Sequence, residues 1–384
     1  MLTHALPKPL TIANILELAF PNASSFETDT AAKERHVYVV PQGSEPRWII
    51  VGEPHRVLGV LRSWNPWNAA SRLRWGAVKF AASARLLPML PGVQSIVFQI
   101  QTAYWRSHLP EFPEEWNVVI HVGNPSYTRK AIVFFVAKDG SVKFAAKAPL
   151  VVGADAAIMN EAAMLNLVKG LMQVPRVVFQ DSARSIVAQT WLEGRPVSRG
   201  FTDAHLDLLS LLANSGRSVK ISDYRAEISS ELEKTDLPFD RAALARALEF
   251  LDFDAPLQSF VEHRDFAPWN LKWVRNGELG LLDWEWSVSD GLPWQDACRF
   301  FFLEDAHFSG NGRVWEAITT NEFLLKYRQR FDIPSAALPA LTMRYLLGVL
   351  TMDWKSGNEG LARYTFGQIA KLLDTCPQGI FTNS

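Results

Sequence analysis

Short apolar runs separated by turn residues dominate the middle of the chain. Residues 118–122, 131–137 and 142–148 are apolar stretches of strand length, and Asp139-Gly140 lies between the second and the third. An Asp-Gly pair between two such runs is a frequent hairpin turn. The pattern predicts a three-stranded antiparallel meander, with residues 186–191 as a further buried strand.

Other patterns flank this meander. Upstream, residues 36–41 and 47–52 are rich in β-branched and aromatic residues, which favours strands, and residues 68–87 follow as a helix. Downstream, Ile158, Ala162 and Leu165 recur at helical spacing behind Asp155, which predicts a helix capped by that aspartate.

The last half of the chain has mainly helical periodicity. Leu244, Leu248 and Leu251 form one apolar face behind a capping Asp240, and residues 313–330 and 337–354 continue amphipathic patterns. The exception is residues 261–286, where two short apolar pieces, 271–274 and 279–282, flank Asn276-Gly277. That arrangement predicts a small hairpin within a helical region.

These patterns predict an α+β protein of three parts. Residues 1–111 are an N-terminal accessory region of mixed strand and helix, whose fold the pattern does not name. Residues 112–192 are strand-rich, and residues 193–384 are mainly helical.

Composition narrows the possible functions. The 384 residues are 48% hydrophobic with a net charge of −1, which fits a globular protein and disfavours a nucleic-acid partner. Cys298 and Cys376 stand far apart, so neither a disulfide framework nor a zinc site is indicated. Polar residues and prolines interrupt residues 1–20 and 86–100, which predicts no export signal or membrane span and a cytoplasmic protein.

The predicted hairpin lies between two groups of polar residues. His263-Arg264-Asp265-Phe266-Ala267-Pro268-Trp269-Asn270 precedes it, and Leu282-Asp283-Trp284-Glu285 follows it. Phosphoryl transfer to an alcohol uses an aspartate beside the attacking hydroxyl, and amide and carboxylate oxygens that hold Mg²⁺. A helix cap, a turn residue and a surface acid are the alternative interpretation of the same three residues.

At these residues the chain resembles the aminoglycoside phosphotransferase and choline kinase superfamily, relatives of protein kinases. Their catalytic loop reads His-x-Asp-x-x-x-x-Asn, and their metal-binding Asp follows a hairpin. The resemblance covers about residues 112–377 and implies a bilobal protein-kinase-like fold, with an antiparallel-sheet N-lobe and a mainly helical C-lobe. It implies Asp265 as the catalytic base and Asn270 and Asp283 as magnesium ligands.

The resemblance extends upstream to nucleotide-binding residues. Lys147 resembles the strand lysine that contacts ATP phosphates, and Glu161 the helix glutamate that pairs with it, with Lys143 as the rival lysine. By position, Gly123 and Ser126 would lie in the loop over the phosphates, although an ordinary hairpin loop fits equally well. The hinge that holds adenine would comprise Gln189, Trp191 and Leu192.

Three neighbours of the motif have structural or auxiliary interpretations. Glu285 follows Asp283 by two, so in an extended segment it would assist the metal, and an ion pair with Arg264 is the alternative. His263 is interpreted as a buried scaffold residue. Asp296 resembles an acid that braces the catalytic loop in the family.

The sequence after Asp283 indicates a small acceptor. It lacks the long activation segment and the Ala-Pro-Glu signature of protein kinases. We therefore expect an ATP- and Mg²⁺-dependent kinase of small hydroxyl compounds of aminoglycoside, sugar or amino-alcohol type. Carboxylates for a cationic acceptor exist at Glu304, Asp305, Asp353 and Glu359. A catalytically silent nucleotide-binding or scaffold protein is the second hypothesis.

Residues 54–110 contain no Asp or Glu. They carry seven basic residues and four tryptophans: Arg56, Arg62, Arg72, Arg74, Lys79, Arg85 and Arg106, with Trp64, Trp67, Trp75 and Trp105. Two interpretations are open. The stretch 62–106 is a peripheral surface for anionic lipid or a protein partner, or it packs against the strand-rich part with its tryptophans buried and its arginines paired.

Overall fold

The computed structural model describes residues 11–21, 33–41, 45–64, 69–109, 111–113, 115–197, 200–274, 277–309, 312 and 314–376. The chain divides into two compact units, which are described separately below. The sheet unit comprises residues 1–169 and 175–193, and the helical unit comprises residues 170–174 and 194–384.

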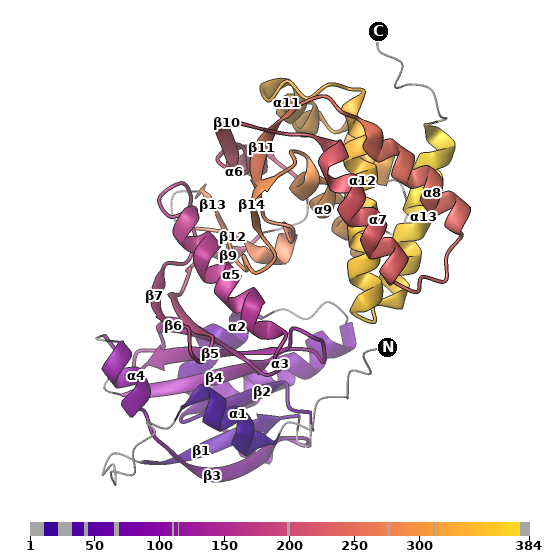
Figure 1. The fold of residues 1–384 in the computed structure, drawn as a ribbon. Helices are drawn as coiled ribbons and strands as arrows, with labels where there is room; N and C mark the ends of the chain where they lie inside the picture. The colour runs from indigo at the N-terminus through magenta and orange to yellow at the C-terminus, as the bar shows by residue number, and fades with distance from the viewer. Residues whose placement is uncertain are drawn as a thin grey trace. The chain divides into compact units, whose positions relative to one another are not determined.

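One antiparallel sheet of eight strands, in the order β3-β1-β2-β4-β5-β6-β8-β7, forms the centre of the sheet unit (Figure 1). Its strands are β1 (Lys33–Val40), β2 (Trp48–Val51), β3 (Gln94–Ile100), β4 (Trp116–Val122), β5 (Lys130–Ala137), β6 (Val142–Pro149), β7 (Val177–Asp181) and β8 (Ile186–Thr190). The predicted meander is present as β4-β5-β6. Strand β2 pairs with β4, so the strands on either side of residue 111 share one sheet.

Both faces of this sheet are covered. Helices α1 (Ile12–Ala19) and α4 (Ala103–His108) pack on one face with Val118 and Ile120, while α2 (Leu58–Ser63) and α3 (Ala69–Ser83) pack on the other with Val119. Successive strand residues point to opposite faces, so a strand buried on both faces must be apolar throughout. This explains why the centre of β4, residues 118–120, is a continuous apolar run rather than an alternating one.

Helix α5 (Ala154–Leu167) follows β6 and packs against β8 through Ile158 and Ala162. Its N-cap is Gly153, and Asp155 lies in the first turn, so the predicted cap was two residues too late. An acid in the first turn still favours the helix through its dipole.

The helical unit consists mainly of helices with two small sheets, β10-β11-β14 and β13-β12-β9. Its helices are α6 (Asp203–Ser210), α7 (Arg225–Lys234), α8 (Arg241–Glu249), α9 (Gln295–Glu304), α10 (Val314–Thr320), α11 (Glu322–Arg330), α12 (Ala337–Lys355) and α13 (Glu359–Thr375). Its strands are β9 (Arg195–Pro196), β10 (Ala213–Val219), β11 (Leu257–Glu262), β12 (Leu271–Trp273), β13 (Leu279–Leu281) and β14 (Val288–Gly291). The α+β fold predicted from the sequence is confirmed.

Local signals placed most of these elements correctly. Asp240 caps α8 by accepting from the Ala242 N–H, and β12 and β13 form the predicted hairpin. Asn276 of its turn and Arg313 lie outside the described residues. The amphipathic stretch predicted over 313–330 is two helices, because Asn321 ends α10 and caps α11 with its own side chain.

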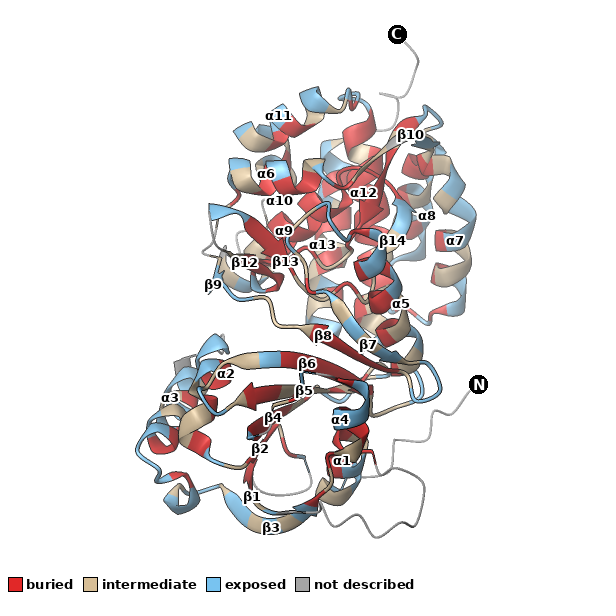
Figure 2. Cartoon of the chain, turned by 90° about the vertical axis from the view of Figure 1, so that its left-hand side faces the viewer, coloured by how far each residue is buried: buried red, intermediate tan, exposed pale blue. Residues whose placement is uncertain are grey.

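Long buried helices support the site. Helix α12 is buried along most of its length (Figure 2) and contacts both α9 and α13. Among the described residues, no helix combines the length and hydropathy needed to cross a bilayer. Cys298 on α9 is buried, and neither cysteine forms a disulfide.

Candidate active site

The catalytic loop begins where β11 ends, and its backbone is held by a buried acid. Asp296, near the start of α9, accepts hydrogen bonds from the N–H groups of His263 and Arg264, both at 2.8 Å. Burial and the nearby Glu262 raise the pKa of Asp296 to about 7. The bracing role that the family resemblance implied for Asp296 therefore has a direct geometric basis.

His263 is completely buried and supports the loop from within. Its Nε2 donates to the Leu282 carbonyl at 2.9 Å, and its Nδ1 accepts from the Asp265 N–H at 3.2 Å. Only the neutral imidazole can donate at one nitrogen and accept at the other. Burial lowers the pKa of His263 to about 4, despite the nearby Asp265 and Asp283 carboxylates. These contacts agree with the scaffold interpretation of this residue.

Asp265 is held at both carboxylate oxygens. Oδ1 accepts from Arg299 Nη2 at 2.8 Å and Nε at 3.2 Å, and Oδ2 accepts from Asn270 Nδ2 at 2.8 Å. Asn270 Nδ2 also donates to the Asp265 carbonyl at 2.9 Å. An ionised carboxylate offers about four acceptor positions. One position on Oδ2 remains for an incoming hydroxyl group.

The hairpin returns the chain to Asn270. The Leu282 N–H donates to the Asn270 carbonyl at 2.9 Å, so the following residue, Asp283, lies at the catalytic loop. The Asp265 and Asp283 carboxylates both lie near His263, so the backbone brings the three predicted residues to the same part of the helical unit. Asp283 has φ +64°, a left-handed conformation that is costly for a residue other than glycine and that clusters at functional sites.

The donor set at this position suits Mg²⁺. Asn270 turns its amide nitrogen toward Asp265, so its amide oxygen is the atom left for a cation, and Asp283 contributes a half-buried carboxylate. Hard oxygen donors that leave room for water and phosphate oxygens are the ligands Mg²⁺ prefers. Among the described residues no cluster of three His, Cys, Asp or Glu forms a metal site of its own. A magnesium site here would therefore be completed by the substrate.

Glu285 does not lie as the sequence argument assumed. The left-handed Asp283 and the turn at Glu285 mean that residues 283–285 are not an extended segment, so the two carboxylates do not share a face for that reason. Arg264, the alternative partner, instead lies 3.4 Å from Glu262. A metal-binding role for Glu285 remains a prediction without this support.

Sequence reasoning missed Arg299. This arginine lies on α9 immediately before the run Phe300-Phe301-Phe302, and it is 8% exposed. A charged side chain in a buried apolar run requires a partner, because an isolated buried charge is very costly. That signal was visible in the sequence, although the identity of the partner, Asp265, was not.

In the sheet unit, Lys147 and Glu161 form the predicted ion pair. Lys147 on β6 and Glu161 on α5 are both buried, and Nζ lies 2.6 Å from Oε2. The rival Lys143 is exposed near the hairpin turn. A lysine buried on a central strand with one carboxylate partner is the arrangement expected for a phosphate-binding residue, and its contact with ATP remains a prediction.

The loop between β4 and β5 is held by both backbone and arginine side-chain hydrogen bonds. The Gly123 N–H donates to the Lys130 carbonyl at 2.9 Å, and Arg129 Nε donates to the Gly123 carbonyl at 3.0 Å. The loop also lies on the start of α5, where a Cβ on Gly153 would stand 2.2 Å from the Tyr127 carbonyl oxygen. Gly153, which the sequence analysis did not single out, thus permits this close approach. Ser126 is half-buried in the same loop, and phosphate contacts by Gly123 and Ser126 remain predictions.

The three predicted hinge residues end the sheet unit. Gln189 on β8 is buried, and its side-chain oxygen has no hydrogen-bond partner among the described residues. Trp191 packs edge-on against Phe134 with ring centroids 5.5 Å apart, and Leu192 is half-buried beside it. Contacts of these three residues with adenine remain a prediction.

Comparison with known proteins identifies the family. The family model described as "Phosphotransferase enzyme family" matches residues 131–332, more than half of the chain. The chain belongs to this family. The match includes Lys147, Glu161, Asp265, Asn270 and Asp283. No curated protein matches the sequence of this phosphotransferase.

Solved structures of the same fold agree with this result. One is a thermostable mutant of aminoglycoside phosphotransferase APH(4)-Ia in its apo form. Its sequence is 13% identical to this chain, and the two structures align with a TM-score of 0.50 over 68% of this chain and 95% of the other. A ternary complex of that enzyme with AMP-PNP and hygromycin B aligns with TM-score 0.51 and 13% identity, over 71% of this chain and 99% of the other. At this identity the likeness establishes the kinase-like fold of the phosphotransferase alone.

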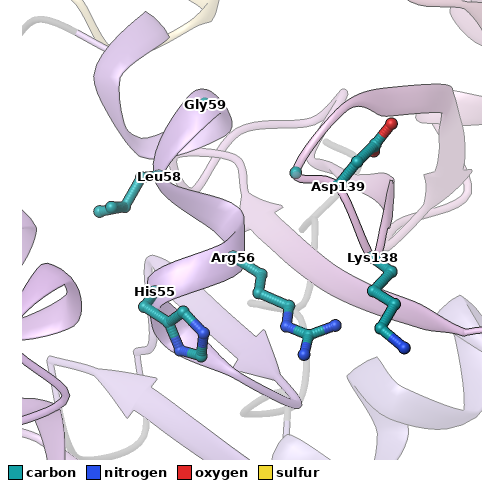
Figure 3. Close-up of a pocket in the computed structure, with 7 residues that line it drawn as sticks. His55, Arg56, Leu58, Gly59, Lys138 and Asp139 are labelled. Carbon is teal, nitrogen blue, oxygen red and sulfur yellow. The ribbon is translucent and has the colours of Figure 1, made fainter.

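The sheet unit of the phosphotransferase contains a hollow whose lining includes none of the predicted site residues. It has a volume of about 540 Å³ and is lined by His55, Arg56, Lys138 and Asp139 (Figure 3). Its cations are already paired, since Arg56 lies 2.7 Å from Glu53 and Lys138 lies 2.9 Å from Glu115. It therefore offers no obvious unpaired cation for phosphate.

The basic stretch of the phosphotransferase shows a mixture of the two expected arrangements. Trp75 and Trp105 are buried in the two cores of the sheet unit, whereas Trp64 is 36% exposed and Trp67 lies outside the described residues. Leu73 and Phe80 on α3 are exposed. The packing interpretation holds for the two buried tryptophans, and a lipid or protein contact remains untested.

Proposed function

We propose that this phosphotransferase is a kinase that transfers the γ-phosphoryl group of ATP to a hydroxyl group of a small acceptor. The observation that carries the proposal is the geometry of Asp265. Arg299 and Asn270 hold its two carboxylate oxygens, and Leu282 joins the chain at Asn270 so that Asp283 follows at the same place.

Asp265 orients the attacking hydroxyl group. The acceptor donates its O–H to the remaining acceptor position on Oδ2, which directs the oxygen lone pair at the γ-phosphorus. The new O–P bond forms as the bond to the β-phosphate oxygen breaks, ADP leaves, and the hydroxyl proton passes to Asp265. The Arg299 ion pair holds the carboxylate in position before the reaction.

The remaining predicted residues would act on the nucleotide. Lys147, oriented by Glu161, would neutralise phosphate oxygens, and Gly123 and Ser126 would contact them from the loop. Adenine would contact Gln189, Trp191 and Leu192. Asn270 and Asp283 would hold Mg²⁺, which would neutralise charge on the phosphates. In this proposal residues 112–192 bind the nucleotide, residues 193–384 provide the base and the acceptor site, and residues 1–111 have no assigned chemical role.

The test is ATP turnover by the full chain with a panel of hydroxyl compounds. Asp265→Asn should lower kcat by about 10²- to 10⁴-fold, the usual contribution of general acid–base catalysis. Asp290→Asn is the matched control, because Asp290 is an exposed acid of the same unit that pairs only with neighbours such as Arg217. Full activity in Asp265→Asn would exclude this mechanism, and absence of turnover with bound ATP would favour the silent nucleotide-binding module.

A further inference from the structure

The helical unit contains a partly open cavity of about 240 Å³. Its walls come from α7, the segment after β11, α9 and α12. Three arginines line it: Arg264, Arg299 and Arg344. None of the carboxylates considered for a cationic acceptor, namely Glu304, Asp305, Asp353 and Glu359, is among its lining residues.

Arg299 connects this cavity to the proposed catalytic base. Arg299 lines the cavity and donates two hydrogen bonds to Asp265 Oδ1. Arg264, which also lines it, is the residue immediately before Asp265. A small molecule in the cavity would therefore lie beside Arg299, which in turn binds the Asp265 carboxylate.

Each of the three arginines has a nitrogen without an acceptor among the described residues, namely Arg264 Nε, Arg299 Nη1 and Arg344 Nε. Arg344 donates from Nη1 to Glu262 at 3.1 Å and to Gln295 at 2.9 Å, but its Nε has no hydrogen-bond partner. Arg264 Nε is 3.4 Å from Glu262 and forms no hydrogen bond. Arg344 is 9% exposed, so leaving its donor unsatisfied is costly unless a ligand supplies an acceptor.

The acids around the cavity are too few to satisfy these donors. Glu262 is shared between Arg264 and Arg344, and its other oxygen, Oε2, lies against Gly291. Glu231 is bound by Lys355, and Glu227 is exposed. Among the described residues, the buried part of the lining thus presents N–H donors of three arginines without acceptors, against one unpartnered carboxylate oxygen, Glu262 Oε2.

The backbone at Arg264 supports a role for its side chain. Its φ is +66°, a left-handed conformation that costs a residue other than glycine about 1–2 kcal/mol in general. The hydrogen bond from its N–H to Asp296 holds that conformation. Strain of this kind persists where the surrounding structure fixes it, and it is frequent at binding sites.

We propose that this cavity is the acceptor site and that it takes a small hydroxyl compound with an anionic group, a carboxylate or a phosphate, bound by Arg264 and Arg344. The inference rests on the proposed kinase function. Guanidinium groups bind such anions through paired N–H donors, and polycationic acceptors would meet the same groups unfavourably. At about 240 Å³ the cavity is smaller than the usual range of ligand pockets, which favours an acceptor of monosaccharide size.

Binding is tested with four probes of the same carbon skeleton: gluconate, glucose 6-phosphate, glucose and glucosamine. We expect the two anions, or one of them, to raise the thermal midpoint of the full chain, whereas glucose and glucosamine do not. Comparing gluconate with glucose 6-phosphate shows whether the cavity binds a carboxylate or a phosphate. The same shift should occur in Asp265→Asn, since binding does not require transfer.

The variants are Arg264→Gln and Arg344→Lys, with Arg363→Gln as a control on the exposed face of α13. In turnover assays we expect kcat/KM for the best anion to exceed that for glucose by about 10-fold or more, and each variant to reduce this ratio about 10-fold. The Arg344→Lys variant retains a positive charge for Glu262, which protects the fold.

The inference is overturned if glucose or glucosamine shifts the midpoint as much as the anions, or if the anion effect survives in both variants. Those outcomes concern the cavity alone. Failure of the kinase proposal would be recognised by a different result. The anions would still raise the thermal midpoint, but the unaltered chain would transfer phosphate to none of the four probes.

Discussion

Two loops of this phosphotransferase are held in different ways. In the helical unit, side chains hold the predicted catalytic loop: Asp296 accepts from two backbone N–H groups, His263 contacts Asp265 and Leu282, and Arg299 binds the Asp265 carboxylate. In the sheet unit, the loop between β4 and β5 is held by backbone hydrogen bonds, including one at Gly123, and by the side chains of Arg129 and Arg47. It also lies on α5 at a glycine.

This contrast explains why the first loop has a recognisable sequence motif and the second does not. A loop held by side chains needs particular residues at particular positions, so it leaves a readable motif. A loop held partly by backbone groups accepts more sequences, provided that close approaches are kept open by glycine. The weak glycine signature between β4 and β5 is therefore compatible with a defined loop conformation.

The largest effect is expected at Arg299. Arg299→Met should lower kcat about 100-fold with little change in the KM for ATP, because a misplaced Asp265 no longer aligns the hydroxyl group. Arg299→Lys should recover part of the loss, since it restores one charged donor but not the two-point contact. Steady-state kinetics on the full chain measure both values.

The Arg363→Met variant controls for loss of an arginine from the helical unit, because Arg363 is exposed on α13. If Arg299→Met raised KM and left kcat unchanged, Arg299 would not position the base. The catalytic loop would then not depend on this contact.

A pH-dependent effect of intermediate size is expected at His263. Burial lowers its folded-state pKa to about 4, below the unfolded value near 6.5, so its neutral form stabilises the fold above pH 6.5. As pH falls from 6.5 to 4, the contribution of His263 to the free energy of unfolding should decrease by about 1.4 kcal/mol per pH unit. The stability advantage of the unaltered chain over His263→Asn should shrink accordingly.

Urea unfolding of both proteins at pH 7, 6 and 5 measures that difference. The raised pKa of Asp296 acts in the opposite direction, because its contribution falls as pH rises toward 7. Asp296 is present in both proteins, so its contribution cancels to first order. A pH-independent difference would mean that His263 does not titrate as described.

The smallest effect is expected at the loop between β4 and β5. Gly153→Ala should destabilise the chain by about 1–3 kcal/mol, because the new Cβ would overlap the Tyr127 carbonyl oxygen. Gly76→Ala is the matched control within α3, where a Cβ meets no atom within 4 Å, and it should stabilise by about 0.5–1 kcal/mol. Equal unfolding midpoints for the two variants would contradict the close approach.

The sequence by itself determined the elements and the order of the chemical groups. Apolar runs with turn residues located β4, β5 and β6, and the two halves of the catalytic motif located Asp265, Asn270 and Asp283. These signals are local, since strand and helix periodicity and loop motifs act over a few neighbouring residues. They therefore survive in a single sequence.

Only the tertiary structure decided which distant residues contact one another. It paired Arg299 with Asp265 and Arg344 with Glu262, residues 34 and 82 positions apart. It also joined β1, β2 and β3 to the sheet of β4, and it turned Asp283 away from the extended conformation on which the argument for Glu285 relied. Contacts between distant residues depend on how whole elements pack, and a buried charge can find its partner on any of them.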